Sequence, residues 1–340
     1  MKTVFVGLSG GVDSAVSAYL LKREGYNVVG AFIKGWEPDF LPCTGVRDRL
    51  EAMRVAAHLG IPFKTYDLEE AYKREVVDYF IAEYRAGRTP NPDVMCNRAI
   101  KFGAFWEKAK ADGADAIATG HYAIREREGE KWHLKTSADR EKDQTYFLWT
   151  LTQDDLAHVL FPVGAREKND VRKLALEAKL PNASRPDSQG LCFLGHVDME
   201  AFLKRYLPVT PGVMRDEKGN EAGSHDGAWF YTLGQHVRAS GSSRRYVVGK
   251  NMEKNELIVS EEPFGEEAKK EHALVRENWI SEAPDDEPLL VRYRYRQPLI
   301  TSRIRDNKVI FHEPHLIAPG QSLVVYDKKG EICLGGAVIA

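Results

Sequence analysis

The chain has 340 residues, 43% of them apolar, and a formal net charge of −2. This length suits two or three domains, and the near-zero charge gives no sign of a nucleic-acid binder, although basic stretches can be offset by acidic faces elsewhere. No apolar run reaches the roughly 18 residues that a membrane helix needs, and the apolar start is too short for a secretory signal, so we expect a cytoplasmic protein without a membrane partner.

The first 120 residues alternate short apolar runs with helical patterns. Runs typical of strands occupy residues 3–8, 28–33, 63–66 and 116–118. Helical patterns lie between them and end at Gly25, Gly60, Arg85 and about Asp112. This alternation predicts an α/β fold, with a parallel sheet covered by helices on both faces.

The pattern changes beyond about residue 200. Residues 213–260 are glycine-rich with short β runs, which predicts a small central module. From about residue 270 the pattern is all-β. There Val291, Tyr293 and Tyr295 alternate with arginines at 292, 294 and 296, the period of a strand. We therefore expect a C-terminal β-barrel or sandwich, and domains of 1–199, 200–268 and 269–340.

A glycine-rich loop lies between the first predicted strand and helix. Its glycines allow positive φ and a close approach of backbone amides to an anion, and the following helix offers its positive dipole end. No Gly-Lys-Ser/Thr follows, so this is not a Walker loop, and it is not the dinucleotide GxGxxG either. A plain strand-to-helix turn is the alternative, but paired glycines flanked by serines and an aspartate favour a phosphate site. The loop consists of Gly7, Leu8, Ser9, Gly10, Gly11, Val12, Asp13 and Ser14.

The stretch from Ser9 to Ser14 resembles the loop of the ATP-pyrophosphatase superfamily, whose members cleave ATP between the α- and β-phosphates and adenylate a substrate oxygen. The resemblance implies ATP as a substrate, Mg²⁺ bound with it, which Asp13 could orient, and no permanent cofactor. Ligands of open parallel sheets collect at the carboxyl ends of the strands. Ile33 and Gly120 end or follow such strands and are candidates for contacts with the adenosine, although Ile33 could equally be a core residue.

The four cysteines are too widely spaced for a paired-cysteine zinc or iron–sulfur site. Cys43 and Cys333 are interpreted as structural. Cys192 lies between glycines at 190 and 195, which is typical of a mobile loop. Cys96 follows a proline-rich loop of residues 87–95. On these features alone, Cys96 and Cys192 could each be reactive or a buried, inert thiol.

The surroundings of Cys96 favour reactivity. Asn97 is predicted to cap the next helix, which would place Cys96 at a helix N-terminus and lower its pKa below the roughly 8.5 of a free thiol. Arg98 and Lys101 would add to this effect. Asp93 could act as an acid or base beside the thiol.

Taken together, the motifs resemble the bacterial and organellar tRNA-specific 2-thiouridylases along nearly the whole chain. Several rare motifs in the right order are far more specific than any one of them. The resemblance implies a PP-loop domain similar to the adenine-nucleotide hydrolases, followed by the central module and a β-barrel. The motifs are residues 9–14, 87–96, 119–122, 142–148, 191–195, 293–297 and 319–321.

The resemblance also implies a reaction: ATP-dependent 2-thiolation of the wobble uridine in tRNA. ATP adenylates the 2-carbonyl oxygen, and a persulfide on Cys192, loaded by a relay protein or a cysteine desulfurase, attacks the activated carbon. Cys96 then releases the product and leaves a Cys96–Cys192 disulfide, or in a variant releases sulfide first. Asp93 is the implied acid or base, and the expected acceptors are the tRNAs for Lys, Glu and Gln.

Further residues match positions that contact tRNA in this family. Asn91, Pro92 and Asp93 correspond to the segment that meets the flipped base. Two of the other matches have ordinary alternatives. His121 could be a buried histidine whose ring is hydrogen-bonded to the backbone. The alternation of arginine and tyrosine could be the solvated face of an ordinary strand. The remaining matches are His121, Lys142, Asp143, Gln144, Arg294, Tyr295 and Gln321.

One departure and two alternatives remain. Residues 236–241 replace the arginine and glycine-rich segment that usually follows 231–235 in the family, which bears on the tRNA contacts of the central module. An ATP pyrophosphatase acting on a small molecule would need the loop but neither Cys96 nor Cys192. A catalytically silent RNA-binding protein with this fold would release no pyrophosphate.

Overall fold

The computed structural model describes residues 1–40, 45–187, 192, 198–238, 244–265, 267–284 and 286–340. Cys43 and the glycines that flank Cys192 lie outside these residues, so the predictions made for them stay predictions. In the part of the chain that is described, no helix has both the length and the apolarity needed to cross a membrane.

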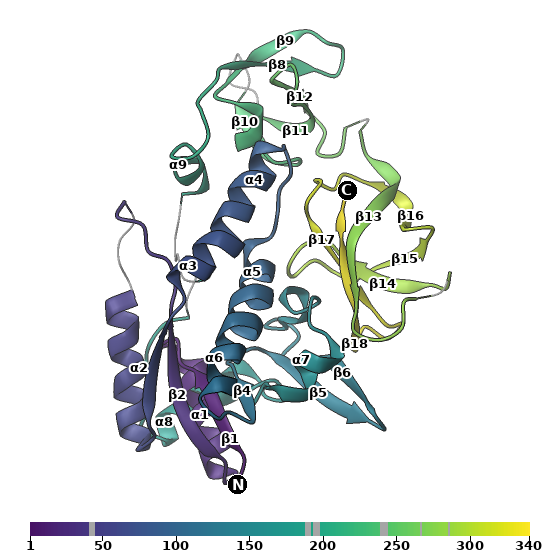
Figure 1. Cartoon of the computed structure of the whole chain (residues 1–340). Coiled ribbons are helices and arrows are strands. Elements are labelled where there is room, and N and C mark those ends of the chain that lie inside the picture. The colour runs from purple at the N-terminus through teal and green to yellow at the C-terminus, as the bar shows by residue number, and fades with distance from the viewer. Residues whose placement is uncertain (41–44, 188–191, 193–197, 239–243, 266, 285) are drawn as a thin grey trace.

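Five parallel strands form the N-terminal sheet in the order β3-β2-β1-β4-β7 (Figure 1). The chain builds outward from β1 in one direction through β2 and β3, then returns to the other side of β1 for β4. Such a reversal leaves a crevice at the carboxyl ends of the two central strands, here β1 and β4. The strands are β1 (Thr3–Gly7), β2 (Asn27–Lys34), β3 (Phe63–Asp67), β4 (Ala116–Ala118) and β7 (Val159–Leu160).

Helices cover both faces of this sheet. Successive side chains of β1 point to opposite faces, and each set packs against a different group of helices. Val4 and Val6 pack in a buried cluster with α1 (Val12–Arg23), α2 (Gly45–Leu59) and α8 (Lys168–Glu177). Phe5 packs in the opposite cluster, with side chains of two long helices. The parallel sheet covered on both faces that the alternation predicts is confirmed.

Each long helix contains a π-helical stretch, in which the backbone makes a wider turn. The first runs through α3 (Glu69–Tyr72), π-helical Lys73–Asp78 and α4 (Tyr79–Arg85). The second runs through α5 (Pro92–Met95), π-helical Cys96–Ala104 and α6 (Phe105–Ala111). Cys96 thus opens the π-helical stretch of the second helix.

A central sheet of five strands follows the short helix α9 (Met199–Leu203), in the order β10-β11-β12-β8-β9. Its small core includes Met214, Val247 and Leu257. Figure 1 shows this module at the far end of α4 from the parallel sheet. The strands are β8 (Gly212–Asp216), β9 (Glu221–His225), β10 (His236–Arg238), β11 (Arg244–Asn251) and β12 (Glu256–Ser260).

The last strands form a closed six-stranded barrel rather than a sandwich, because β13 pairs with both β16 and β18. The predicted order of parallel sheet, central module and β-barrel is therefore confirmed. Cys333 is fully buried in β18, and burial raises its pKa to about 12, consistent with a structural thiol. The strands are β13 (Lys269–Trp279), β14 (Leu289–Arg292), β15 (Ile300–Arg305), β16 (Lys308–His315), β17 (Ser322–Tyr326) and β18 (Ile332–Ile339).

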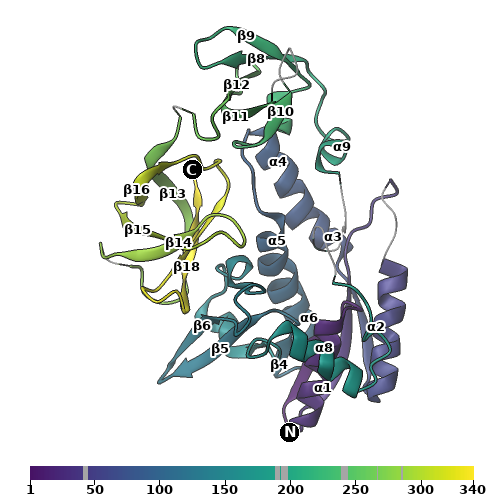
Figure 2. The same cartoon turned by 180° about the vertical axis from the view of Figure 1, so that it is seen from behind.

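A hairpin from the N-terminal part of the chain extends the barrel sheet. Its strands are β5 (Ala123–Glu128) and β6 (Lys131–Thr136), and β6 pairs with β18. Figure 2 shows the hairpin below the barrel, seen from behind. Two short helices follow the hairpin, Thr145–Phe147 and α7 (Gln153–His158), and a third, Ala228–Phe230, lies between β9 and β10 of the central sheet.

The prediction that residues 291–296 form one alternating strand is wrong in part. β14 ends at Arg292, and Arg296 has a φ of +61°, which breaks an extended chain. Arg292 is buried, and its guanidinium lies 3.4 Å from the carboxylate of Asp143. This ion pair compensates for the buried charge, and a period-two pattern does not reveal it.

Candidate active site

The glycine-rich loop lies where β1 ends and α1 begins, and its two serines hold its shape. Ser14 Oγ accepts the backbone N–H of Ser9 at 3.2 Å and donates to the Gly11 carbonyl at 3.1 Å. Ser9 Oγ in turn accepts the N–H of Gly11 at 3.3 Å. Gly10 has a φ of +79°, a conformation that favours glycine. The loop is therefore an internally bonded turn at the N-terminus of a helix, a position suited to binding phosphate.

The segment after β4 packs directly against this loop. A Cβ on Gly120 would lie only 2.7 Å from the backbone nitrogen of Ser14, so glycine is needed for this close approach. The neighbouring strands β1 and β4 bring the two segments together. Ile33, at the end of β2, is 7% exposed and belongs to the core cluster.

A cluster of charged side chains lies beside the loop. Lys168 Nζ lies 2.6 Å from Asp13 Oδ1 and 2.9 Å from Asp187 Oδ1. Lys142 lies 2.9 Å from the other oxygen of Asp187, and Arg172 also pairs with Asp187. Lys142, which the family resemblance assigns to tRNA, thus lies in this cluster.

Sequence reasoning missed Lys168 and Arg172 of this cluster, as well as Asn182 and Arg185, which both donate hydrogen bonds to the Gly10 carbonyl. The only signal in the sequence is two cations four residues apart, at 168 and 172, in a helical pattern, which is common on solvated helices. Their approach to the loop depends on the packing of α8 against α1.

Two thiols meet near this edge of the sheet. Cys96 Sγ and Cys192 Sγ lie 3.1 Å apart, although the two residues are 96 positions apart in the chain. The backbone of Cys192 is held on both sides: its N–H donates to Asp93 Oδ1 at 3.0 Å, and its carbonyl accepts from the Tyr72 hydroxyl at 2.7 Å. The three residues assigned to catalysis, Cys96, Cys192 and Asp93, are thus brought together.

The two thiols have opposite electrostatic environments. Burial raises the pKa of Cys96, which is 0% exposed, and its hydrogen bond to Cys192 raises that pKa further. The same hydrogen bond lowers the pKa of Cys192; burial opposes this, and the charge of Lys101 adds to it. Cys192 therefore ionises first, and Cys96 is the thiol that donates to it.

The predicted low pKa of Cys96 is therefore wrong. The helix begins at Pro92, where Asn91 is the N-cap and its side chain accepts the N–H groups of Asp93 and Val94. Cys96 lies a full turn inside the helix and is buried. Asn97, the predicted cap, is buried too and donates to the Phe147 carbonyl at 3.0 Å.

Lys101 and His121 connect the thiols to the phosphate loop. Lys101 Nζ lies 3.5 Å from His121 Nε2, and the other ring nitrogen lies 2.7 Å from Thr119 Oγ1. Burial, with a smaller contribution from Lys101, lowers the pKa of His121, so the ring is neutral. Since Gly120 packs on the loop, the loop, this segment and the thiols form one continuous site.

The other residues matched to tRNA contacts have mixed environments. Asp143 is buried and accepts a hydrogen bond from Thr145 Oγ1 at 2.8 Å, so its tRNA contact stays a prediction. Gln144 accepts the Tyr122 N–H at 2.9 Å, and Gln321 donates to the Thr89 carbonyl at 3.0 Å. Arg294 is exposed, and the ring of Tyr295 lies 4.6 Å from that of Phe147.

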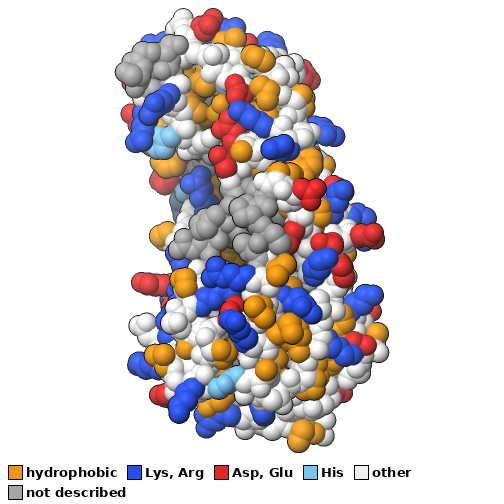
Figure 3. All heavy atoms as spheres, turned by 90° about the vertical axis from the view of Figure 1, so that its left-hand side faces the viewer, with side chains coloured by type: hydrophobic (Ala, Val, Ile, Leu, Met, Phe, Trp, Pro, Cys, Tyr) orange, Lys and Arg blue, Asp and Glu red, His pale blue; other side chains and the backbone are white. Residues whose placement is uncertain are grey.

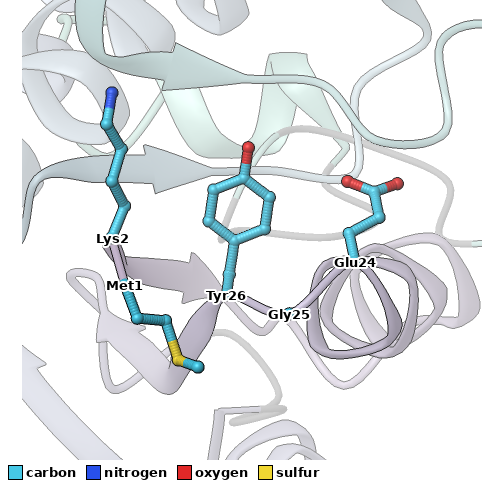
Figure 4. Close-up of a pocket in the computed structure, with 5 residues that line it drawn as sticks. All are labelled: Met1, Lys2, Glu24, Gly25 and Tyr26. Atoms are coloured by element: carbon cyan, nitrogen blue, oxygen red, sulfur yellow. The ribbon is translucent and has the colours of Figure 1, made fainter.

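The search for metal ligands and for pockets covers the described residues. Among the described residues, no three His, Cys, Asp or Glu side chains are placed to hold a metal ion. One pocket lies at the opposite end of β1, lined by Met1, Lys2, Glu24, Gly25 and Tyr26 (Figure 4). This pocket is therefore separate from the phosphate loop, which follows the other end of β1, and from the thiols.

Three family models match consecutive parts of the chain. Residues 2–196 match a model described as a tRNA methyl transferase HUP domain. Residues 200–261 match a tRNA methyl transferase PRC-barrel domain, and residues 270–339 an aminomethyltransferase beta-barrel domain.

Curated relatives match over almost the full length. A tRNA-specific 2-thiouridylase MnmA of Listeria monocytogenes is 43% identical, with 99% of this chain and 94% of the relative covered. The proteins of the same name from Geobacillus thermodenitrificans and Exiguobacterium sibiricum are 44% and 45% identical, with 94% and 93% of each relative covered.

Solved structures match less closely. The U34-tRNA thiolase NcsA from Methanococcus maripaludis is 19% identical, with a TM-score of 0.38 and coverage of 61% of this chain and 67% of that one. A 4-thiouridine synthetase in complex with RNA and ATP is 19% identical, with a TM-score of 0.35 and coverage of 60% and 50%. Likenesses this weak say nothing of the site in this chain.

Proposed function

The chain belongs to the tRNA-specific 2-thiouridylase family, and on that premise we propose that it uses ATP to exchange the 2-oxygen of a tRNA uridine for sulfur. One observation carries this proposal: the 3.1 Å approach of Cys96 Sγ to Cys192 Sγ, at the edge of the sheet that also holds the phosphate loop. An S–S bond of about 2.05 Å requires the sulfurs to move only slightly closer.

ATP is the proposed first substrate, bound by the loop from Gly7 to Ser14 with its Mg²⁺ beside Asp13. The α-phosphate is attacked by the 2-oxygen of the uridine, which releases pyrophosphate and leaves an O-adenylyl uridine. This step turns a poor leaving group into AMP. Backbone amides of the loop and the start of α1 stabilise the charge that develops on the phosphate.

Sulfur transfer is the proposed second stage. Cys192, the thiol with the lowered pKa, takes a sulfur atom from the persulfide of a donor protein. The terminal sulfur attacks C2 and expels AMP. The Cys96 thiolate then attacks Cys192 Sγ, releases the thiouridine and leaves a disulfide that an external dithiol must reduce. Asp93 accepts the proton of the Cys96 thiol or returns it. Burial raises the pKa of Asp93, which suits a group that exchanges a proton with a thiol.

The finer parts of the proposal follow the family. They are the wobble position of the uridine, the acceptor tRNAs for Lys, Glu and Gln, loading of Cys192 by a relay protein or a cysteine desulfurase, and a cytoplasmic reaction. Lys and Arg side chains gather on the face of the α/β domain next to the undescribed residues (Figure 3). Such a face suits the tRNA backbone, and Arg294 and Tyr295 add a cation and a ring on the barrel side.

The test is a nucleoside mass analysis of tRNA from a strain lacking the modification, after incubation with ATP, Mg²⁺, a persulfide donor and the enzyme. We expect 2-thiouridine, and mass also separates sulfur exchange from methyl addition, the chemistry named by the family models. Cys192→Ser and Cys96→Ser should each abolish the product while tRNA-dependent pyrophosphate release largely survives. The buried Cys333→Ser serves as a control, which should cost stability but retain thiolation.

Three outcomes would point elsewhere. Full activity of either variant at 96 or 192 would overturn the proposed roles of the two thiols. Pyrophosphate release without tRNA would favour a synthetase for small molecules, and binding of tRNA without any pyrophosphate release would favour a silent RNA-binding protein.

A further inference from the structure

His121 is a buried residue, and both nitrogens of its ring have partners inside the protein. The residue is 8% exposed, and its ring contacts those of Phe102 and Phe161, with centroids 5.7 and 6.2 Å apart. Nδ1 lies 2.7 Å from Thr119 Oγ1, and Nε2 lies 3.5 Å from Lys101 Nζ. Both nitrogens are thus engaged, whereas the family resemblance assigns this residue to tRNA.

These two contacts determine which nitrogen of His121 carries the proton. Burial lowers the pKa of the ring, and the charge of Lys101 lowers it further, so the ring is neutral. A neutral imidazole has one donor and one acceptor, and an ammonium group can only donate. Nε2 is therefore the acceptor that faces Lys101, and Nδ1 donates its proton to Thr119 Oγ1.

Lys101 brings a positive charge to the two thiols. Burial opposes its charged form, but the charges of Cys192, Cys96 and Asp93 and a hydrogen bond to Cys192 outweigh burial and raise the pKa of Lys101. The hydrogen bond from Cys96 and the charge of Lys101 both lower the pKa of Cys192. Tyr72 completes the titratable groups at this residue, and its hydroxyl donates to the Cys192 carbonyl. Among these four described neighbours of Cys192, Lys101 is the cation.

We propose that His121 is a positioning residue for sulfur transfer, whose Nε2 holds the ammonium group of Lys101 beside Cys192, the thiol that takes up sulfur. An ammonium group on a flexible four-carbon stem is strongly hydrated in water, and inside a protein its N–H groups require acceptors. His121 supplies an acceptor without adding a negative charge, which would raise the pKa of Cys192. The inference rests on the proposed function, since it concerns the reactivity of Cys192 in that reaction.

Side-chain length separates the two nitrogens of the ring. The amide of asparagine reaches the place of Nδ1 and that of glutamine the place of Nε2, so His121→Asn loses the acceptor for Lys101 and His121→Gln retains one. Thr119→Val removes the acceptor for Nδ1–H, so that the proton can move to Nε2, where the ring no longer accepts from Lys101. His158→Asn is the matched control, because His158 is also 8% exposed and its ring stacks on Trp106, with centroids 3.9 Å apart.

The test is the pH profile of Cys192 alkylation by iodoacetamide, read by peptide mass spectrometry on reduced, full-length protein without ATP, tRNA or a sulfur donor. At pH 7, His121→Asn should react at least about threefold more slowly than the wild type, because its thiolate is less stabilised, and its profile should move toward alkaline pH. Thr119→Val should shift the profile in the same direction, which provides a second route if His121→Asn folds poorly. His121→Gln and His158→Asn should react at a rate near that of the wild type.

A double-mutant cycle shows whether His121 acts through Lys101. In the Lys101→Met background, His121→Asn should slow alkylation no further. A wild-type profile in His121→Asn and Thr119→Val, or the same slowing by His121→Asn with and without Lys101, would overturn the inference. A higher KM for tRNA with an unchanged Cys192 profile would overturn it as well, and would support a tRNA contact of His121 instead. If the expected shift is present but the wild type forms no 2-thiouridine, the proposed function alone is overturned.

Discussion

The phosphate loop and the thiol pair, the two halves of the site, are built in opposite ways. The loop is a run of consecutive residues whose serines bond to its own backbone, as in the 3.1 Å contact from Ser14 Oγ to Gly11. The thiol pair joins residues 96 positions apart, and other segments hold the backbone of Cys192. The difference teaches that hydrogen bonds between near neighbours in the chain shape the loop, whereas the contact between the two thiols exists only once distant segments have folded together.

The largest expected effect breaks the loop half alone. Gly120→Ala places a methyl group 2.7 Å from the backbone nitrogen of Ser14, so the loop must shift. We expect ATP binding, measured by equilibrium dialysis, to weaken about 10- to 100-fold, the cost of overpacking at such a contact. Oxidation of Cys96 and Cys192 to a disulfide by diamide should proceed at the wild-type rate.

Gly113→Ala is the control for that change. Gly113 has nothing within 4 Å of an added Cβ, although its φ of +89° makes alanine unfavourable there. It should lower thermal stability slightly and leave ATP binding intact. Equal ATP affinity in the two variants would mean that the approach of Gly120 to the loop is unimportant.

A smaller effect should separate the two thiols. Lys101→Met removes a charge that lowers the pKa of Cys192, so that pKa should rise. Alkylation requires the thiolate, so its rate increases with pH up to the pKa, and the pH profile should move toward alkaline pH. At pH 7 the rate should fall about tenfold.

Lys108→Met, an exposed position on the same helix, should leave the alkylation profile unchanged. Cys96 should react far more slowly than Cys192 at every pH, because burial and the hydrogen bond raise its pKa. A faster reaction at Cys96 would reverse the assignment of which thiol is charged.

The smallest effect on catalysis is expected from Arg292→Met, which belongs to neither half. The pair with Asp143 has side-chain exposures of 10% and 1%, so the change leaves a buried carboxylate without its cation. We expect a loss of about 3 kcal/mol of unfolding free energy at pH 7, measured by urea denaturation. ATP binding and the pKa of Cys192 should stay near wild type.

The loss should shrink as the pH falls. Burial raises the pKa of Asp143 above that of the unfolded chain, so the folded protein takes up a proton more readily and regains stability as the pH decreases through that raised pKa. Arg303→Met is the control, since Arg303 and Asp286 lie 3.8 Å apart with about half of each side chain exposed; its effect should stay below about 1 kcal/mol. An equally large loss at pH 5 and pH 7 would argue that packing, rather than charge, dominates at Arg292.

The sequence predicts the loop half well and the thiol half poorly, for a physical reason. The glycines and serines of the loop act through neighbours in the chain, so their spacing suffices. The contact of Cys96 with Cys192 depends on how two distant segments pack, and the residues by themselves leave each thiol open to an inert interpretation. Only the resemblance to a family predicts that Cys96 and Cys192 act as a pair.

The errors have the same origin. Because asparagine is a good N-cap, Asn97 suggests a helix that begins beside Cys96. The helix instead begins at Pro92, with Asn91 as its N-cap, so Cys96 lies inside the helix and is buried. Lys168 escapes sequence reasoning because a lysine in a helical pattern is typical of a solvent-facing position. Its burial between Asp13 and Asp187 is a tertiary property.

The hairpin of β5 and β6 has a consequence for any attempt to divide the protein. Leu134 and Lys135 of β6 pair with Cys333 and Ile332 of β18, so the last strand of the chain completes a sheet begun two hundred residues earlier. A shortened chain ending before the barrel would leave an unsatisfied strand edge and the buried Leu134 exposed to water. The C-terminal barrel is thus not an independent domain, and moving it onto another nucleotide-binding protein would require moving the hairpin as well.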